Sequence, residues 1–337
     1  MKEVLIMRKR GRLAPMLSVL LLIASVSFTG LARSEYPERP VTVIVGMDAG
    51  GPTDIAVRAM APGVGNYLAQ PIIVENKGGG AGTVAMSLAA VAKPDGYTVC
   101  CAHSDAFVNT ALMQKLPFRP LKSFTSIMGF GLAEHAALLV KSDAPWKTFK
   151  EFLEYAKKNP GKIKYSTPGI GLGMHIAMEV VALKEGIKWV HVPYKGIAPA
   201  RTALLGGHVE ACSSSIDWPP FVQSGALRVL ATYGQNRSPH FPDVPTIKEL
   251  GYDFVNAAVY CIVGPAGMPA DVQKKLETAF TRATETPEFR GIMDKLYLTP
   301  AHYSGADYDR HLKEKWVRTE ALFKEIGIIK ESATQPY

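Results

Sequence analysis

Short β-branched runs alternate with longer amphipathic segments along most of the chain. The first run, at 41–45, is followed by glycines between Gly46 and Gly51 and by Pro52, which suits the first turn of a helix. The same order of strand, glycine-rich turn and helix returns over residues 163–185. Because strands alternate with helices, the pattern predicts an α/β protein whose parallel strands are joined by helical crossovers.

Local signals mark the ends of several later elements. Thr148 and Glu151 match a capping box, and an apolar face from Phe149 to Ala156 predicts a helix that stops at Pro160. Other apolar patterns predict three strands and then two closing helices, at about 136–140, 227–234, 259–267, 269–284 and 305–326.

The first 34 residues have a different character. Basic residues at 8–12 precede a mostly apolar, uncharged segment at 13–31, and small residues follow. We therefore expect a cleaved secretory signal peptide at 1–34, with Ala-Arg-Ser before Glu35 as the cleavage site and Gly-Leu-Ala ending at Ala32 as the second choice. The alternative is an uncleaved anchor, because the apolar segment approaches the roughly 20 residues that span a bilayer. Cleavage would place the mature chain in the periplasm.

Removing that segment changes the charge of the protein. The full chain carries +8, and residues 1–34 contribute +5 of it, so +3 remains for residues 35–337. The basic character of the whole chain is mostly a property of its leader, and nucleic-acid binding is not predicted.

Four cysteines lie in apolar, strand-like surroundings without C-x-x-C spacing: Cys100, Cys101, Cys212 and Cys261. Buried free thiols are the expected state, and a single disulfide is the alternative in an oxidising compartment. The sequence contains no metal-binding or cofactor motif, so neither a metal nor a cofactor is predicted.

The turn at 46–54 is the first candidate binding site. The first N–H groups of a helix lack intrahelical partners and the macrodipole adds positive potential, so an anion is the expected guest. The second strand–turn–helix unit, near 166–175, would aim another helix N-terminus at the same cleft. The glycine loop at 78–82 lacks the G-x-x-x-x-G-K-[ST] pattern and is expected to be structural, with backbone contacts to a ligand as the alternative.

Collinear motifs over residues 36–328 resemble one family, the periplasmic solute-binding proteins of tripartite tricarboxylate transporters, also called the Bug or TctC family. The resemblance rests on many blocks, among them YPERPVTVIV, AGGPTD at 49–54, LAQPIIVENKGGGAGT, NPGKIKYSTPGIG, HVPYKG-x-APA at 191–200 and GPAGMPADV.

The resemblance implies a type II periplasmic-binding fold, in which two α/β domains joined by crossover strands close on a ligand in the cleft between them. We expect one domain at 35–138 plus 255–337 and the other at 139–254. The implied function is that of a monomeric receptor that captures a small carboxylate and delivers it to a membrane permease.

The same resemblance assigns residues to the ligand. On one side of the cleft, Gly50, Gly51 and Thr53 are expected to face a carboxylate. The residues implied on the other side are Pro168, Gly169, Gly171 and His175, although a structural role would explain His175 equally well.

Departures from the family pattern narrow the expected ligand. Apolar side chains replace polar ones, so apolar walls are predicted from Met47, Ile170, Leu172 and Met174. A carboxylate with an apolar or aromatic body therefore fits better than citrate. Asp48 stands where a small residue is usual, and it either receives a ligand ammonium or hydroxyl group or, as we prefer, stays solvated or bonded to nearby backbone.

Four further polar residues are candidates on position alone. Ser104, Ser214 and Asp217 follow strands at the expected edge of the cleft, where ligand contact and a structural role are equally expected. Asp54 lies in the first turn of a helix, where stabilisation of the dipole explains it better than ligand contact.

Two other functions compete with transport. The same binding domain would serve as a co-receptor that presents its liganded form to a sensor kinase, and sequence does not separate the two roles. A periplasmic enzyme is disfavoured, because neither a G-x-S-x-G nor an H-E-x-x-H motif is present.

Overall fold

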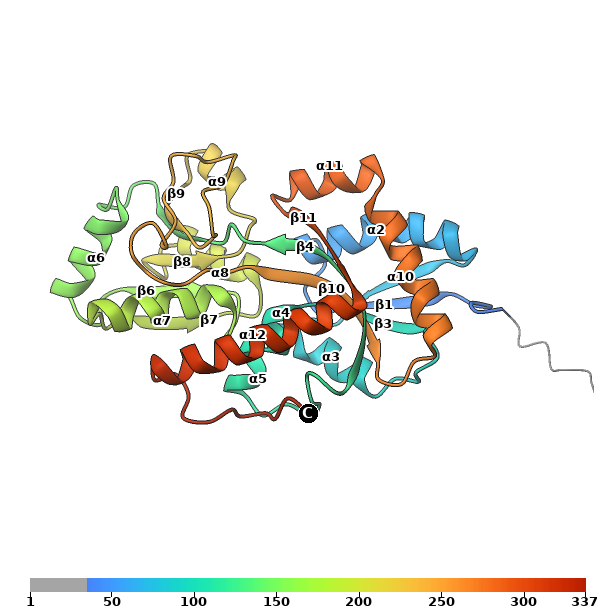
Figure 1. Ribbon diagram of the computed structural model, residues 1–337. Helices are drawn as coiled ribbons and strands as arrows, with labels where there is room; N and C mark the ends of the chain where they lie inside the picture. Colours follow the sequence, from blue (N-terminus) through green and yellow to red (C-terminus); the bar gives the residue numbers. More distant parts are fainter. Residues whose placement is uncertain (1–34) are drawn as a thin grey trace, which may run out of the picture. The chain divides into compact units, whose positions relative to one another are not determined.

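Two mixed β-sheets with helices packed on them organise the protein (Figure 1). The computed structural model describes residues 35–337, and the predicted signal peptide lies outside them. Every strand and helix of the described chain lies within residues 39–337, which form one unit. Within residues 35–337 no helix is both long and apolar enough to cross a bilayer.

The first sheet has the strand order β11-β4-β10-β3-β1-β2. β1 runs parallel to β2 and β3, whereas β10 is antiparallel to β3 and β4, and β11 is antiparallel to β4. Its strands are β1 (Val41–Val45), β2 (Ile72–Asn76), β3 (Thr98–His103), β4 (Phe124–Ala133), β10 (Ala258–Pro265) and β11 (Thr299–Ser304). The helices of this part of the chain are α2 (Pro52–Leu68), α3 (Thr83–Ala90), α4 (Ser104–Phe107), α5 (Asn109–Met113), α10 (Ala270–Thr284), α11 (Pro287–Lys295) and α12 (Gly305–Glu325).

The second sheet has the order β7-β6-β8-β5-β9. β6 is parallel to β7 and β8, and β5 is antiparallel to β8 and β9. Its strands are β5 (Ala137–Lys141), β6 (Lys164–Thr167), β7 (Val190–Pro193), β8 (Ala211–Ser214) and β9 (Leu227–Thr232). The accompanying helices are α6 (Phe149–Lys158), α7 (Gly173–Glu185), α8 (Ile197–Leu205) and α9 (Pro219–Gln223).

Most elements follow the local signals in the sequence. The capping box is confirmed, since Thr148 Oγ1 accepts the Glu151 N–H at 3.2 Å, and α10 and α12 end within one residue of their predicted positions. The expectation of parallel strands holds for three strands of each sheet, because the others return by antiparallel pairing. α11 and β11 were not predicted, although Thr286 caps α11 through the Phe289 N–H and most of β11 alternates in burial.

The expected domain boundaries can be placed beside the sheets. The strands of the first sheet all fall within 35–138 and 255–337, and β5 begins at Ala137, two residues before the predicted boundary. The chain passes between the sheets through residues 134–136 and 233–257, which are hydrogen-bonded where Tyr233 N donates to Ala136 O at 2.8 Å. The boundaries themselves stay a prediction.

The four cysteines are free and buried, which confirms the free-thiol prediction. Three of them lie in β3 and β10, and Cys212 lies in β8. Burial raises the pKa of the Cys261 thiol to about 12, so it is protonated at neutral pH.

A buried carboxylate forms an ion pair within the first sheet's part of the chain and a hydrogen bond to a helix of the second sheet. Asp105, only 2% exposed, sits in α4, where its Oδ1 lies 3.0 Å from Lys315 Nζ of α12. Its other oxygen accepts the Gly173 N–H, at the N-terminus of α7, at 2.9 Å. Burial by itself raises the pKa of Asp105, yet the charge of Lys315 and the Gly173 N–H bring it below its ordinary value. The carboxylate is therefore ionised and binds α7 to the first sheet.

Two histidines stack beside the second sheet. The rings of His175 and His191 have centroids 4.2 Å apart, and Thr167 Oγ1 lies 2.7 Å from His191 Nε2. Burial, with a smaller effect of His175, lowers the pKa of His191 to about 3. Both rings are therefore neutral in the folded protein at neutral pH.

Asp105→Asn should lower the free energy of unfolding by about 3 kcal/mol, because it leaves the Lys315 ammonium buried without its counter-ion. Urea unfolding at pH 7 measures the change. The matched control is Asp143→Asn, which removes the carboxylate of an exposed pair with Lys141 and should cost no more than about 0.5 kcal/mol. Equal losses in the two variants would show that the buried pair is not stabilising.

His191→Gln should flatten the dependence of stability on pH. The unfolded chain protonates His191 near pH 6.5 and the folded chain does not, so its effect is absent above that pH and destabilises the fold as the pH falls below it. Between pH 7 and 5 the wild type should lose about 1 kcal/mol more than the variant, allowing for solvent at this half-exposed ring. Exposed His302→Gln should keep the wild-type slope in the same urea titrations, and an unchanged slope in His191→Gln would contradict the assignment.

Candidate functional site

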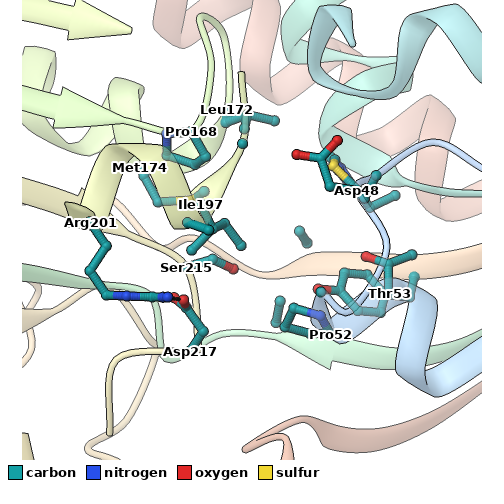
Figure 2. Close-up of a pocket in the computed structure, with 18 of the residues that line it drawn as sticks. Asp48, Pro52, Thr53, Pro168, Leu172, Met174, Ile197, Arg201, Ser215 and Asp217 are labelled. Atoms are coloured by element: carbon teal, nitrogen blue, oxygen red, sulfur yellow. Dashed lines mark ion pairs between the residues drawn. The ribbon is translucent and has the colours of Figure 1, made fainter. Parts of the chain in front are cut away.

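A cavity of about 290 Å³ lies where loops from both sheets meet. The first sheet contributes the β1–α2 turn and residues at the end of β3, and the second contributes the β6–α7 turn, the start of α8 and the loop after β8. Figure 2 shows Asp48 and Thr53 on one side of the cavity and Arg201 with Asp217 on the other, with Leu172, Met174 and Ile197 between them. Apolar side chains form most of its wall.

The structure brings nine of the predicted contact residues to this cavity: Met47, Asp48, Gly50, Gly51, Thr53, Pro168, Leu172, Met174 and Asp217. Gly169 and Ile170 line instead a neighbouring cavity of about 240 Å³, whose wall also includes Met47, Asp48 and Pro168. These shared residues line both cavities.

The N-terminus of α2 opens into the cavity. Gly51 is its N-cap and Pro52 its first residue, as the sequence predicted. Two backbone N–H groups of the turn are hydrogen-bonded within it, since Gly50 N donates to Asp54 Oδ2 at 2.8 Å and Gly51 N to Asp48 O at 3.3 Å. The N–H group of Thr53 has no acceptor among the described residues, and because Thr53 lines the cavity it is the one free for an anion.

The Thr53 side chain adds a hydroxyl at the same place. It is hydrogen-bonded to Tyr260, another lining residue, on β10. Burial raises the pKa of Tyr260 to about 12, so the phenol keeps its proton and can donate it. The Tyr260 hydroxyl and the free Thr53 N–H form a compact pair of donors on the side of the first sheet, with the Thr53 hydroxyl bonded to Tyr260.

Asp54, by contrast, does not line the cavity. It is 3% exposed, and its Oδ1 accepts Arg58 Nε at 2.9 Å and Asn76 Nδ2 at 3.0 Å. Burial by itself raises its pKa, but the hydrogen bonds from Arg58 and from the Gly50 N–H outweigh burial and lower it. Asp54 thus has the structural role that sequence reasoning preferred.

The N-terminus of α7 also points to the cavity, but two N–H groups of this turn are already in use, whereas the Met174 N–H has no acceptor among residues 35–337. Gly173 N is bonded to Asp105, and Gly171 N donates to His175 Nδ1 at 3.3 Å. Gly171 and His175 are therefore absent from the cavity wall, and His175 stacks on His191 instead. The second helix N-terminus thus lies where it was expected, with the Gly173 N–H taken by Asp105.

Two predicted serines also stabilise the loops rather than face the cavity. Ser104 Oγ accepts the Val259 N–H at 3.1 Å, and Ser214 Oγ donates to Asp217 Oδ1 at 3.1 Å. Neither lies on the cavity wall, although Asp217 does. Asp217 in turn forms an ion pair with Arg201, whose guanidinium lies 4.1 Å from the centroid of the Phe221 ring.

Asp48 reaches across from the β1–α2 turn to the start of α8. A Cβ built on Gly196 would lie 2.5 Å from Asp48 Oδ2, and one on Gly78 would lie 2.6 Å from Oδ1. Its carboxylate therefore occupies a notch that two glycines leave open. No hydrogen bond or ion pair of its side chain occurs among residues 35–337.

Sequence reasoning missed several lining residues that carry polar groups: His103, Asp105, Arg201, Ser215, Asn256 and Tyr260. His103 and Asp105 flank the predicted Ser104. The position at the end of β3 was therefore predicted correctly, but the neighbours of Ser104 line the cavity and Ser104 does not. Arg201 lies in α8, one turn beyond the HVPYKG motif, and no local pattern marked it. Among residues 35–337 no three His, Cys, Asp or Glu side chains are grouped to hold a metal ion.

Comparisons with known proteins place the chain in a family. Residues 56–328 match the family described as "Tripartite tricarboxylate transporter family receptor". A Cupriavidus necator relative, described as "UPF0065 protein in gbd 5'region", is 36% identical over 297 residues, which cover 88% of this chain and 90% of the relative.

Solved structures agree with this assignment and with the fold. The periplasmic binding protein BugD is 31% identical with a TM-score of 0.80, and the match covers 87% of this chain and 99% of BugD. An R. palustris protein with adipate has 25% identity and a TM-score of 0.81 over 87% and 99% of the two chains. MatC from Rhodopseudomonas palustris with bound malate has 28% identity and a TM-score of 0.78 over 85% and 99%. The chain belongs to the TctC (Bug) family of periplasmic solute-binding proteins, with the two-domain α/β binding fold of that family.

Proposed function

We propose that this protein captures a small carboxylate with an apolar or aromatic body in the cavity between its sheets and delivers it to the membrane permease of a tripartite transporter. The observation that carries the proposal is the α2 N-terminus, whose free Thr53 N–H opens into a mostly apolar cavity of about 290 Å³. Relatives with adipate and with malate support a carboxylate as the ligand.

The contacts follow from the geometry of the cavity. One carboxylate oxygen accepts the free Thr53 N–H of α2, and the other accepts the hydroxyl proton of Tyr260, which Thr53 orients by its own hydrogen bond. The body of the ligand packs against apolar side chains from the second sheet, among them Leu172, Met174 and Ile197. Capture then couples to approach of the two sheet-centred domains, which is how such a receptor would signal its loaded state to the permease.

A ligand screen on residues 35–337 tests the proposal. Aliphatic and aromatic carboxylates, amino acids, sugars and cationic amines are compared by thermal shift, and positives are measured by calorimetry. A ligand at about 100 times its Kd should stabilise the protein by about 2.7 kcal/mol. Stabilisation by sugars or cations alone would refute carboxylate binding. Loss of carboxylate uptake when the permease genes are deleted would support delivery, and unchanged uptake would contradict it.

Thr53→Ala should weaken carboxylate binding about three- to tenfold, because it removes one hydroxyl worth roughly 1 kcal/mol at the α2 N-terminus. Calorimetry with the tightest carboxylate of the screen measures the change. The matched control is Thr278→Ala on α10, whose hydroxyl bonds to Lys274 O on an exposed surface and should not affect affinity.

Gly51→Val should abolish binding. Its Cβ would lie 3.3 Å from Asp48 O and its methyl groups would fill the space in front of the free Thr53 N–H. A melting temperature close to that of the wild type would show that the variant folds. Wild-type affinity in a folded Gly51→Val protein would move the carboxylate away from α2.

A further inference from the structure

Three helix N-termini border the cavity, and each is a place where a carboxylate would be stabilised. They belong to α2, α7 and α8, which begin at Pro52, Gly173 and Ile197. A carboxylate of the chain itself lies at each of the three. At α2 it is Asp54, which does not line the cavity and leaves the Thr53 N–H available for an anionic group of the ligand.

The α7 terminus is occupied by a group that cannot be displaced. Asp105 is 2% exposed, its Oδ2 accepts the Gly173 N–H at 2.9 Å, and its Oδ1 lies 3.0 Å from Lys315 Nζ. A ligand that took its place would leave two buried charges without partners, at a cost that a single new contact does not offset. At Gly173 this terminus therefore offers no site for a ligand carboxylate, although its Leu172 and Met174 side chains line the cavity.

The α8 terminus faces Asp48. Its carboxylate lies in the notch between Gly78 and Gly196, the N-cap of α8, and it borders the cavity together with the first residues of that helix. The side chain is exposed to the cavity and has no cationic partner among residues 35–337. A second carboxylate brought to α8 would meet this uncompensated negative charge at short range, where like charges repel strongly.

The cationic side chain of the cavity wall is neutralised as well. Arg201 forms an ion pair with Asp217, and its guanidinium also stacks on Phe221. Asp217 is itself held by Ser214, so the pair is fixed from both ends. The far side of the cavity thus offers no unpaired positive charge to a dicarboxylate.

We propose that Asp48 is a specificity-determining residue that restricts this receptor to monocarboxylates. The single carboxylate binds at α2, the apolar body fills the rest of the cavity, and Asp48 repels any second carboxylate from α8. The inference rests on the proposed function and makes it narrower. It separates this chain from its relatives with adipate and malate, which are dicarboxylates.

Calorimetry with pairs of ligands that differ by one carboxylate tests the inference. The probes are hexanoate with adipate and phenylacetate with 1,4-phenylenediacetate, on residues 35–337 of the wild type and of Asp48→Asn and Asp48→Ala. The wild type should bind the monocarboxylate of at least one pair about tenfold or more tightly than its partner. In both variants the ratio of monocarboxylate affinity to dicarboxylate affinity should fall at least about tenfold. Asp48→Asn keeps the shape of the notch and removes only the charge.

The matched control is Asp143→Asn, which removes one negative charge from an exposed pair far from the cavity wall and should leave the ratio unchanged. A wild type that binds adipate more tightly than hexanoate, or an unchanged ratio in both Asp48 variants, would overturn this inference while leaving carboxylate binding intact. Binding of none of the four acids, with sugars or amines bound instead, would overturn the proposed function itself.

Discussion

The carboxylate of Asp105 joins three elements that lie far apart in sequence. It belongs to α4, its counter-ion Lys315 belongs to α12, and the N–H that it accepts belongs to Gly173 at the start of α7. Removing a carboxylate from water is expensive, and the ion pair and the helix terminus together offset that cost. Because the bond to Gly173 holds the β6–α7 turn against the first sheet, the cavity wall on that side depends on this one interaction.

This interaction and the Arg201–Asp217 ion pair together determine how charge is distributed around the cavity. Negative groups of the protein satisfy α7 and Arg201, so the positive potential left for a ligand is concentrated at the α2 N-terminus. Most of the remaining wall is apolar, and it favours ligands that have apolar surface to bury. A receptor of this kind gains affinity from shape and apolar area on one side and from a few backbone donors on the other.

Sequence alone predicted the elements whose signals are local. Pro52 after a glycine turn, the Thr148 capping box and the β-branched run at 41–45 each lead to the observed structure. The resemblance to a known family supplied the fold, and nine candidate residues, some of them proposed from position or from departures from that family, lie at one cavity. The sequence did not predict which N–H donors are already hydrogen-bonded within the protein. Asp105 and Gly173 are 68 residues apart, and no local pattern near either residue indicates their hydrogen bond. Gly171 and His175 were assigned to the ligand for the same reason, because their mutual hydrogen bond forms only in the folded turn.

Asp48 shows how a departure from a family pattern acquires meaning only in three dimensions. In the sequence it is one polar residue in a glycine turn, and a solvated role was the simpler interpretation. In the structure it reaches the N-cap of α8 because Gly196 has φ +121° and because neither Gly196 nor Gly78 has a Cβ in its path. Two glycines from other loops thus allow an aspartate of the first sheet to set the electrostatic potential at a helix of the second. Because this contact crosses between the sheets, its repulsion would be greatest when they approach each other, so a second carboxylate would weaken closure as well as contact.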